Sequence, residues 1–189
     1  CSYTPADKGY GIRAAIWAGA HLDAEPAPVL FDRGLVAPGV DAGYVDSENA
    51  FGGKAFPGTV GQYNPGSQPF LKVNRHGERF MNESQEYDNA SHASFQQPGH
   101  VYAMIHDANF RSDVDRFHTI GCSALTRYIP GMMEGQLEQY EGEGLIMKAD
   151  TIEELADKMG FTGADKDNFV ATVARYNELY DKQNDEDFG

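Results

Sequence analysis

The stretch that decides the fold reads Val73-Asn74-Arg75-His76-Gly77-Glu78-Arg79-Phe80-Met81-Asn82-Glu83. An apolar run ends at Val73, a polar turn with Gly77 follows, and a second apolar run contains Phe80 and Met81. Two short apolar runs around a glycine-bearing polar turn are typical of a β-hairpin. We therefore predict a hairpin over residues 70–81.

Downstream of the hairpin, the pattern predicts a helix over residues 84–95, which Pro98 and Gly99 would end. Residues 101–105 are rich in β-branched and aromatic side chains and predict a buried strand. Asp107 then stands where an N-cap would begin the next helix, with Arg111 one turn later.

The C-terminal third gives the clearest helical signals. Thr151 and Glu154 have the spacing of a capping box, and Gly160 is expected to end that helix. A last helix is predicted to begin at Asp165 or Asp167. One face of this helix would be lined by Phe169, Val170, Val173, Tyr176, Asn177 and Tyr180. Residues 145–147 are expected to form a short strand.

Near the N-terminus, Gly9 and Gly11 open an alanine-rich stretch. There Ile12, Ala15, Ile16 and Gly19 share one face of a predicted helix. Residues 29–31 are a candidate strand, and residues 34–69, rich in glycine and proline, are expected to be mostly loop. The mixture of elements predicts an α+β fold.

Composition excludes several classes of function. The 189 residues carry a net charge of −14, which repels phosphate backbones and argues against nucleic-acid binding. No apolar run approaches the ~20 residues of a membrane helix, and no signal-like stretch stands at the start. The chain begins at Cys1 and stops at Gly189 after an acidic run, so we expect a piece of a longer protein. The compartment stays open, because an export signal would precede Cys1.

Known catalytic and ligand motifs are scarce. The chain has no Gly-x-Gly-x-x-Gly fingerprint, phosphate-binding loop or Gly-x-Ser-x-Gly elbow, and its six histidines lack metal-ligand spacing. We therefore expect no metal, and we expect Cys122 to be a buried thiol. Polar groups remain at two strand exits: Arg79, Asn82 and Glu83 after the hairpin, and Asp107 and Arg111 after the strand. They could be reacting groups on rigid supports or simply local caps and ion pairs.

The opening stretch resembles the flavoprotein subunits of fumarate reductase and succinate dehydrogenase, whose relatives include flavocytochrome fumarate reductases and bacterial enoate and ketosteroid reductases. Their pattern here is Val-Asn, two residues, then Gly-x-Arg-Phe-x-Asn-Glu. Further stretches agree in the same order. They are Gly9-x-Gly11 with its alanine-rich helix, Thr151-x-Glu153-Glu154-Leu155-Ala156 with Thr172-Val173-x-x-Tyr176-Asn177, and Asp185-x-Asp187-Phe188-Gly189.

The resemblance implies an architecture: a domain that binds FAD, and a capping domain inserted into it that closes over the substrate. Residues 31–189 would be the capping domain, and residues 1–30 a strip of the FAD-binding domain in which Gly9 and Gly11 contact the cofactor. Most contacts to FAD would lie in regions of the polypeptide outside this chain. We therefore expect the chain by itself to be inactive, with the missing FAD-binding domain as its partner.

The resemblance also implies a reaction, the reduction of an activated C=C bond in a small unsaturated acid such as fumarate or another enoate. Arg111 matches the family's proton donor, Glu83 the acid that relays protons to it, and Met81 an apolar wall of the substrate pocket. Tyr87 stands where fumarate reductases carry a second arginine, so we assign it to the proton path. The electron donor is not identified.

Two other functions remain open. The chain could be a cap-derived module that only binds a small acid or a partner protein, without catalysis. Alternatively, the flavin enzyme could be a ketosteroid dehydrogenase, whose chemistry favours tyrosine as an acid or base.

Overall fold

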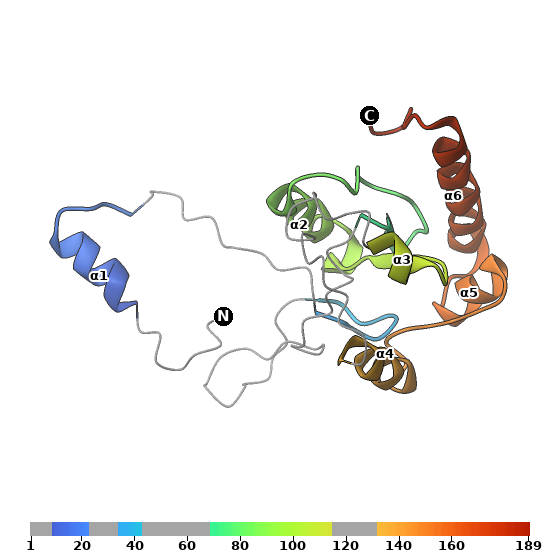
Figure 1. Ribbon diagram of the computed structural model, residues 1–189, viewed down its shortest axis with the longest axis horizontal. Helices are drawn as coiled ribbons and strands as arrows, with labels where there is room; N and C mark the ends of the chain where they lie inside the picture. Colours follow the sequence, from blue (N-terminus) through green and yellow to red (C-terminus); the bar gives the residue numbers. More distant parts are fainter. Residues whose placement is uncertain (1–8, 23–33, 43–68, 115–131) are drawn as a thin grey trace.

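The structure is a computed structural model that describes residues 9–22, 34–42, 69–114 and 132–189 (Figure 1). Helices dominate it, and a small sheet lies between them. In chain order the elements are α1 (Tyr10–Trp17), β1 (Leu71–Val73), α2 (Tyr87–Phe95), the 3₁₀ helix η2 (Pro98–His100), β2 (Ala103–Ile105), α3 (Phe110–Val114), α4 (Met132–Gly142), α5 (Ile152–Lys158) and α6 (Gly163–Lys182).

The sheet consists of β1 and β2, which pair antiparallel with Leu71 opposite Ile105 and Val73 opposite Ala103. All three residues of β1 are buried, so both of its faces are covered. The strand predicted over residues 101–105 forms over Ala103–Ile105, but its residues are half-buried and not buried as expected. The hairpin prediction is wrong in its second arm, because only one bridge joins Val73 to Arg79 and the strand that pairs with β1 is β2.

The turn that follows β1 does form, and Asn74 shapes it. Its backbone N–H donates to the carbonyl of Glu78 at 2.9 Å. Its side-chain Oδ1 accepts the backbone N–H groups of His76 and Glu78. The same side chain donates from Nδ2 to Gln97, just after α2. Asn74 is buried, so these bonds satisfy polar atoms that water does not reach.

Gly77 brings this turn directly against the start of α6. Its φ is +72°, a left-handed value that favours glycine. A Cβ added there would lie 2.4 Å from the carbonyl oxygen of Asp165 and 2.6 Å from the backbone nitrogen of Phe169. Asn168 donates to the carbonyl of His76, and His76 pairs with Asp165 at 3.1 Å. Only a residue without a side chain permits this approach.

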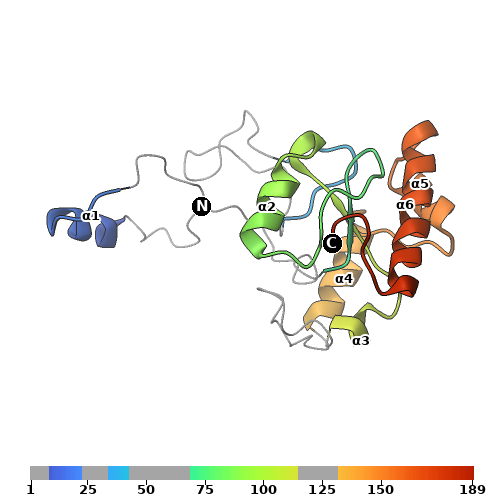
Figure 2. The same ribbon diagram turned by 90° about the horizontal axis from the view of Figure 1, so that it is seen from above.

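The core lies between β1 and the two C-terminal helices. Its buried residues are Leu71, Val73, Ala156, Phe161 and Phe169. Phe169 and Val73 are fully buried, and the ring of Phe161 stacks on Phe169 with centroids 5.2 Å apart. Helices α5 and α6 lie side by side at one end of the molecule (Figures 1 and 2). Burial of these side chains therefore holds the sheet to the α5–α6 pair.

Predictions for the C-terminal helices were confirmed in part. The Thr151 side chain accepts the N–H of Glu154 and caps α5, and Gly160 follows its end with φ +84°. Helix α6 begins at Gly163, not at Asp165 or Asp167, because extended Thr162 is its N-cap. The strand predicted at residues 145–147 is wrong: the N–H groups of Leu145 and Ile146 bond back to Tyr140 and finish the end of α4.

The helix predicted over residues 84–95 is confirmed as α2, but it begins only at Tyr87; as expected, it ends before Pro98. The expected N-cap at Asp107 is wrong, because α3 begins at Phe110. Asp107 instead closes a turn before α3 by accepting the N–H of Asn109 at 2.8 Å. The candidate strand at residues 29–31 and most of the predicted loop at 34–69 lie outside the described residues, as does Cys122.

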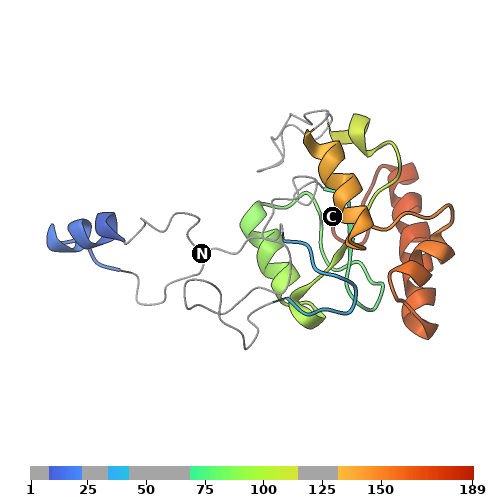
Figure 3. The same cartoon turned by 90° about the horizontal axis from the view of Figure 1, so that it is seen from below.

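Helix α1 is confirmed, but it packs differently from the rest. None of its residues is buried, and Figures 1 to 3 show it apart from the other helices. Tyr10, Ile12, Ile16 and Trp17 are exposed, and Arg13 lies near the rings of both Tyr10 and Trp17. No helix in the described part is long and apolar enough to cross a membrane.

Gly77→Ala should destabilise the fold by about 3 kcal/mol or more, because a methyl group there meets backbone atoms and the left-handed φ is strained. Gly144 has the same φ of +72°, but a Cβ added there would meet nothing within 4 Å. Gly144→Ala is therefore the matched control and should cost about 1–2 kcal/mol. Urea unfolding of both variants measures the difference. Equal losses would show that the turn does not depend on close contact with α6.

Candidate functional site

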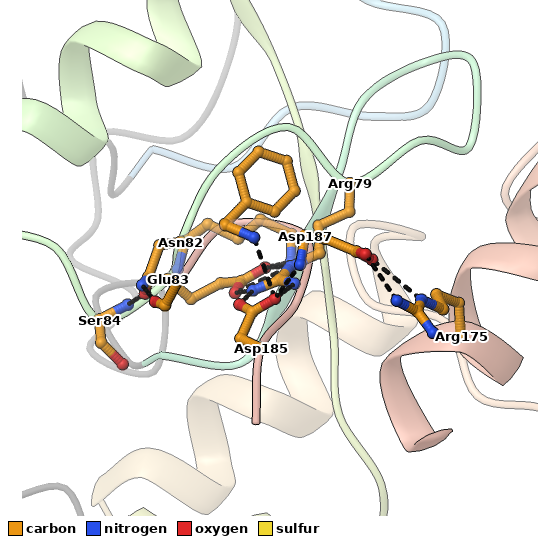
Figure 4. Close-up of polar contacts among 10 residues, drawn as sticks. Arg79, Asn82, Glu83, Ser84, Arg175, Asp185 and Asp187 are labelled. Atoms are coloured by element: carbon orange, nitrogen blue, oxygen red, sulfur yellow. Dashed lines mark hydrogen bonds and ion pairs between the residues drawn. The ribbon is translucent and has the colours of Figure 1, made fainter. Parts of the chain in front are cut away.

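The side chain of Glu83, one of the predicted site residues, is deeply buried, with 3 % of it exposed. It lies just after the turn, where Arg79 donates to both of its oxygens (Figure 4). Arg79 Nε lies 3.0 Å from Oε1 and Nη2 lies 2.7 Å from Oε2. The backbone N–H of Lys72 also donates to Oε1, which fixes the carboxylate against β1.

Asp185 reaches the same guanidinium from the other end of the chain. Arg79 Nη1 lies 3.1 Å from Asp185 Oδ1, and Nη2 lies 2.7 Å from Oδ2. One arginine therefore forms bidentate pairs with two carboxylates, an arrangement that the fork geometry of guanidinium permits and that lysine cannot reproduce. We call Arg79, Glu83 and Asp185 the arginine cluster.

Two aromatic rings flank the cluster. The Cζ atom of Arg79 lies 5.1 Å from the ring centroid of Tyr176 and 4.8 Å from that of Phe188. A guanidinium near an aromatic face is attracted to the ring quadrupole, and the rings also keep water away from the ion pairs. Only 9 % of the Arg79 side chain is exposed.

These contacts shift the pKa values of the cluster. Burial by itself would lower the pKa of Arg79, but its hydrogen bonds to Glu83 and Asp185 outweigh burial and raise it. The same hydrogen bonds from Arg79 lower the pKa of Asp185 to about 2. Burial, helped by the negative charge of Glu83, raises the pKa of Tyr176 to about 12. Arg79 and Asp185 are therefore charged, and Tyr176 is neutral, at physiological pH.

The C-terminal turn, residues 185–189, is held by further contacts. Asp185 Oδ1 accepts the backbone N–H groups of Asp187 and Phe188. Asn82 donates from Nδ2 to the carbonyl of Gly189 at 2.7 Å. Arg175 on α6 pairs with Asp187 at 2.7 Å on the outer side of the turn (Figure 4). The turn is thus attached both to the arginine cluster and to α6.

Met81 lies two residues before Glu83 in the sequence, and only 3 % of it is exposed. These two predicted site residues are therefore buried in the same short segment. Arg111 belongs to α3 and Tyr87 to α2, but the side chains of both lie outside the described residues. Helix α3 is anchored by Phe110, which is buried in a cluster with Phe70. Because Phe70 is two residues before Lys72, one short segment contacts both α3 and Glu83.

Gly9 and Gly11 lie at the start of α1, where Gly9 is the N-cap with φ +67°. A Cβ added at either position would meet nothing within 4 Å, so both glycines border open space. Among the described contacts, none joins α1 to the arginine cluster. No group of three or more His, Cys, Asp or Glu within the described ranges could hold a metal ion.

The sequence alone did not reveal the part that Arg79 and Asp185 play. The sequence placed Arg79 and Glu83 among the polar groups after the predicted hairpin, and the structure shows that they form a buried ion pair. Asp185 is 106 residues from Arg79, and no local pattern marks such a contact. The sequence marked Asp185 only as part of the stretch Asp185-x-Asp187-Phe188-Gly189, which resembles the family, and gave no sign of its partner.

Comparison with known proteins gives the chain its relatives. It is 33% identical over 119 residues to NADH:acrylate oxidoreductase of Vibrio harveyi, covering 63% of this chain and 10% of that protein. It is 36% identical over 137 residues to 3-oxosteroid 1-dehydrogenase of Mycolicibacterium smegmatis, covering 66% of this chain and 21% of that protein. It is 30% identical over 118 residues to fumarate reductase (cytochrome) of Shewanella frigidimarina, covering 62% of this chain and 17% of that protein. The resemblance to flavoproteins of the fumarate reductase type, expected from the sequence motifs, is thereby confirmed.

The chain spans about a tenth to a fifth of the length of these relatives. No protein-family model matches it. All three relatives are named for oxidation or reduction reactions, and all three are bacterial proteins.

Asp185 should make the stability of the chain depend on pH. Because its pKa in the folded protein lies below that of a free carboxyl, its contribution is full above about pH 5 and is lost as pH falls through about 2. The difference in unfolding free energy between wild type and Asp185→Asn should therefore narrow by on the order of 1–2 kcal/mol from about pH 6 to about pH 2, since the side chain is partly exposed. Chemical denaturation at several pH values measures it.

Asp187→Asn is the matched control, since it removes the same charge from the same turn. Asp187 pairs with Arg175 on the exposed side, so its effect should be smaller and should fade in high salt. A constant difference between wild type and Asp185→Asn across this pH range would contradict a stabilising ion pair between Asp185 and Arg79.

Proposed function

We propose that this chain is the capping part of an FAD-dependent oxidoreductase that reduces the activated C=C bond of a small unsaturated acid. The observation that carries the proposal is the similarity to relatives named for acrylate and fumarate, both of which have a C=C bond conjugated to a carboxylate. The arginine cluster also supports the proposal. Arg79 and Glu83 belong to the motif that resembles the family, and they form a buried ion pair beside β1.

The residues at the start of α1 fit a contact with a phosphate-bearing cofactor. Backbone N–H groups at a helix N-terminus attract phosphate, and the glycines at positions 9 and 11 leave room for close approach. The exposed Ile12, Ile16 and Trp17 further suit a helix that another domain covers. The hydride for the reduction would come from FAD when it is bound.

Arg111 is proposed as the group that grips the substrate's carboxylate and delivers the proton. A guanidinium binds a carboxylate in a bidentate manner and stabilises the negative charge that develops when the C=C bond accepts a hydride. Helix α3 suits this role because it follows β2 directly and Phe110 anchors it in the interior. Glu83 would return a proton to Arg111, and buried Met81 would form an apolar wall.

Arg111→Ala should lower turnover of fumarate or acrylate by about 100-fold or more, because both the charge clamp and the proton donor are lost. Flavin absorbance should be retained, since most contacts to FAD are expected elsewhere. The assay uses the flavin-loaded protein that the whole gene encodes. Arg175→Ala is the control: this arginine pairs with acidic groups on the surface of α6 and the C-terminal turn, so turnover should stay within about twofold. Wild-type turnover in Arg111→Ala would remove Arg111 from the mechanism.

A second candidate reaction is the 1-dehydrogenation of a 3-oxosteroid. The similarity to the enzyme of Mycolicibacterium smegmatis favours it, at the highest identity of the three relatives described above. This reaction removes a proton and a hydride from adjacent carbons near a ketone, the chemical reverse of reducing a conjugated C=C bond. A tyrosine can exchange that proton, and Tyr87 on α2 is the proposed residue.

A substrate panel distinguishes the two reactions. If the steroid reaction is correct, the flavin-loaded protein should oxidise a 3-oxosteroid with an artificial electron acceptor, and Tyr87→Phe should lower that rate by about 100-fold or more. If the proposed reduction is correct, fumarate or acrylate should instead oxidise the reduced protein. Activity toward the steroid alone would replace the first proposal with the second.

A further inference from the structure

The contacts of Arg79 point to a positioning role for a residue at the far end of the chain. Asp185 shares the guanidinium of Arg79 with Glu83, and the same nitrogen, Nη2, lies 2.7 Å from an oxygen of each carboxylate. The position of Arg79 therefore depends on both partners. Any change at Asp185 is transmitted to the Glu83 carboxylate through one rigid, planar group.

We propose that Asp185 is a positioning residue that acts through Arg79 to hold the Glu83 carboxylate in place for the reaction. The inference rests on the proposed function, in which Glu83 relays protons. Asp185 would have no contact with the substrate itself. Asp185 binds the guanidinium nitrogens that face the C-terminal turn. The guanidinium is thereby fixed, and so are the N–H groups that it donates to Glu83.

Burial and shape support this role over that of a simple surface ion pair. The side chains of Arg79 and Glu83 are 9 % and 3 % exposed, and that of Asp185 is 23 % exposed. The rings of Tyr176 and Phe188 lie near the guanidinium and restrict its movement. In an ion pair confined in this way, displacement of one side chain displaces its partner. In an exposed pair, flexible side chains absorb the displacement.

The proton relay itself makes the second carboxylate useful. Glu83 accepts hydrogen bonds from Arg79 on both oxygens and from the Lys72 backbone N–H on Oε1. When Glu83 takes up a proton, its attraction for Arg79 weakens, and a guanidinium without another partner could swing away. Asp185 still binds Arg79 in that state, so the donors remain aligned when Glu83 ionises again.

Asp185→Asn is the decisive variant because it keeps the shape of the side chain. The amide oxygen can still accept the N–H groups of Asp187 and Phe188, so the C-terminal turn is retained. However, an NH₂ group then faces Arg79 Nη2, and two donors cannot bond to each other. Arg79 must shift, and the Glu83 carboxylate must shift with it.

The Lys72 backbone N–H reports the position of Glu83 without any assay of activity. In the 189-residue chain, Asp185→Asn should change the NMR chemical shift of this amide and accelerate its hydrogen exchange by about tenfold. Asp187→Asn, with the same loss of charge in the same turn, should leave both unchanged because its side chain bonds to Arg175. Asp185→Glu restores the carboxylate and should recover part of the wild-type signal.

In the flavin-loaded protein of the whole gene, Asp185→Asn should lower kcat by about tenfold to a hundredfold with little change in KM, because a displaced relay slows proton transfer without affecting binding. Asp187→Asn should match wild type. An unaltered Lys72 amide in Asp185→Asn would overturn the inference. So would an altered amide with wild-type kcat, because the position of Glu83 would then not matter to the reaction.

Failure of the proposed function has a different result. In that case the wild-type protein itself would lack activity toward unsaturated acids, whatever the Lys72 amide shows. If Asp185→Asn does not fold, Asp185→Glu gives the same two readings, with a smaller expected change in each.

Discussion

The guanidinium of Arg79 lies between two carboxylates that are far apart in the chain, and the arrangement of the site depends on it. Glu83 follows it by one short loop, while Asp185 comes from beyond the last helix. Two anions and one cation in a mostly buried place are costly unless each oxygen and N–H finds a partner. Here bidentate hydrogen bonds and two flanking rings meet that condition, so the arrangement specifies one geometry.

The close contact between the turn and α6 brings these charges together. Gly77 lets the turn after β1 lie against the backbone of Asp165 and Phe169, and Phe169 fills the core beneath it. This contact sets the direction in which α6 runs, and hence where the C-terminal turn returns to Arg79. The ion pairs and the apolar core are therefore two parts of one packing arrangement.

In our proposal, this arrangement belongs to a domain that covers a substrate bound by another part of the protein. The core and the arginine cluster give the region around β1 a fixed shape, while the exposed apolar residues of α1 would be the surface that the FAD-binding domain covers. In our proposal the tasks are separated: hydride chemistry belongs to the cofactor, and charge, shape and protons belong to this chain. Fixed donors then matter more than strong binding, because their effect is greatest in the transition state.

Local features could be predicted from the order of residues alone: the capping box at Thr151, helices α1 and α2, the strand β2 and the turn at Gly77. Each depends on residues a few positions apart, whose propensities and spacing are visible in the chain. The family could also be recognised in this way, through motifs in the correct order. Two contacts are visible only in the folded chain. Strand β1 pairs with β2 instead of with the residues that follow the Gly77 turn, and Asp185 and Glu83 both form ion pairs with Arg79. Such contacts join residues far apart in the chain, and packing of the whole core selects them, so no local pattern encodes them.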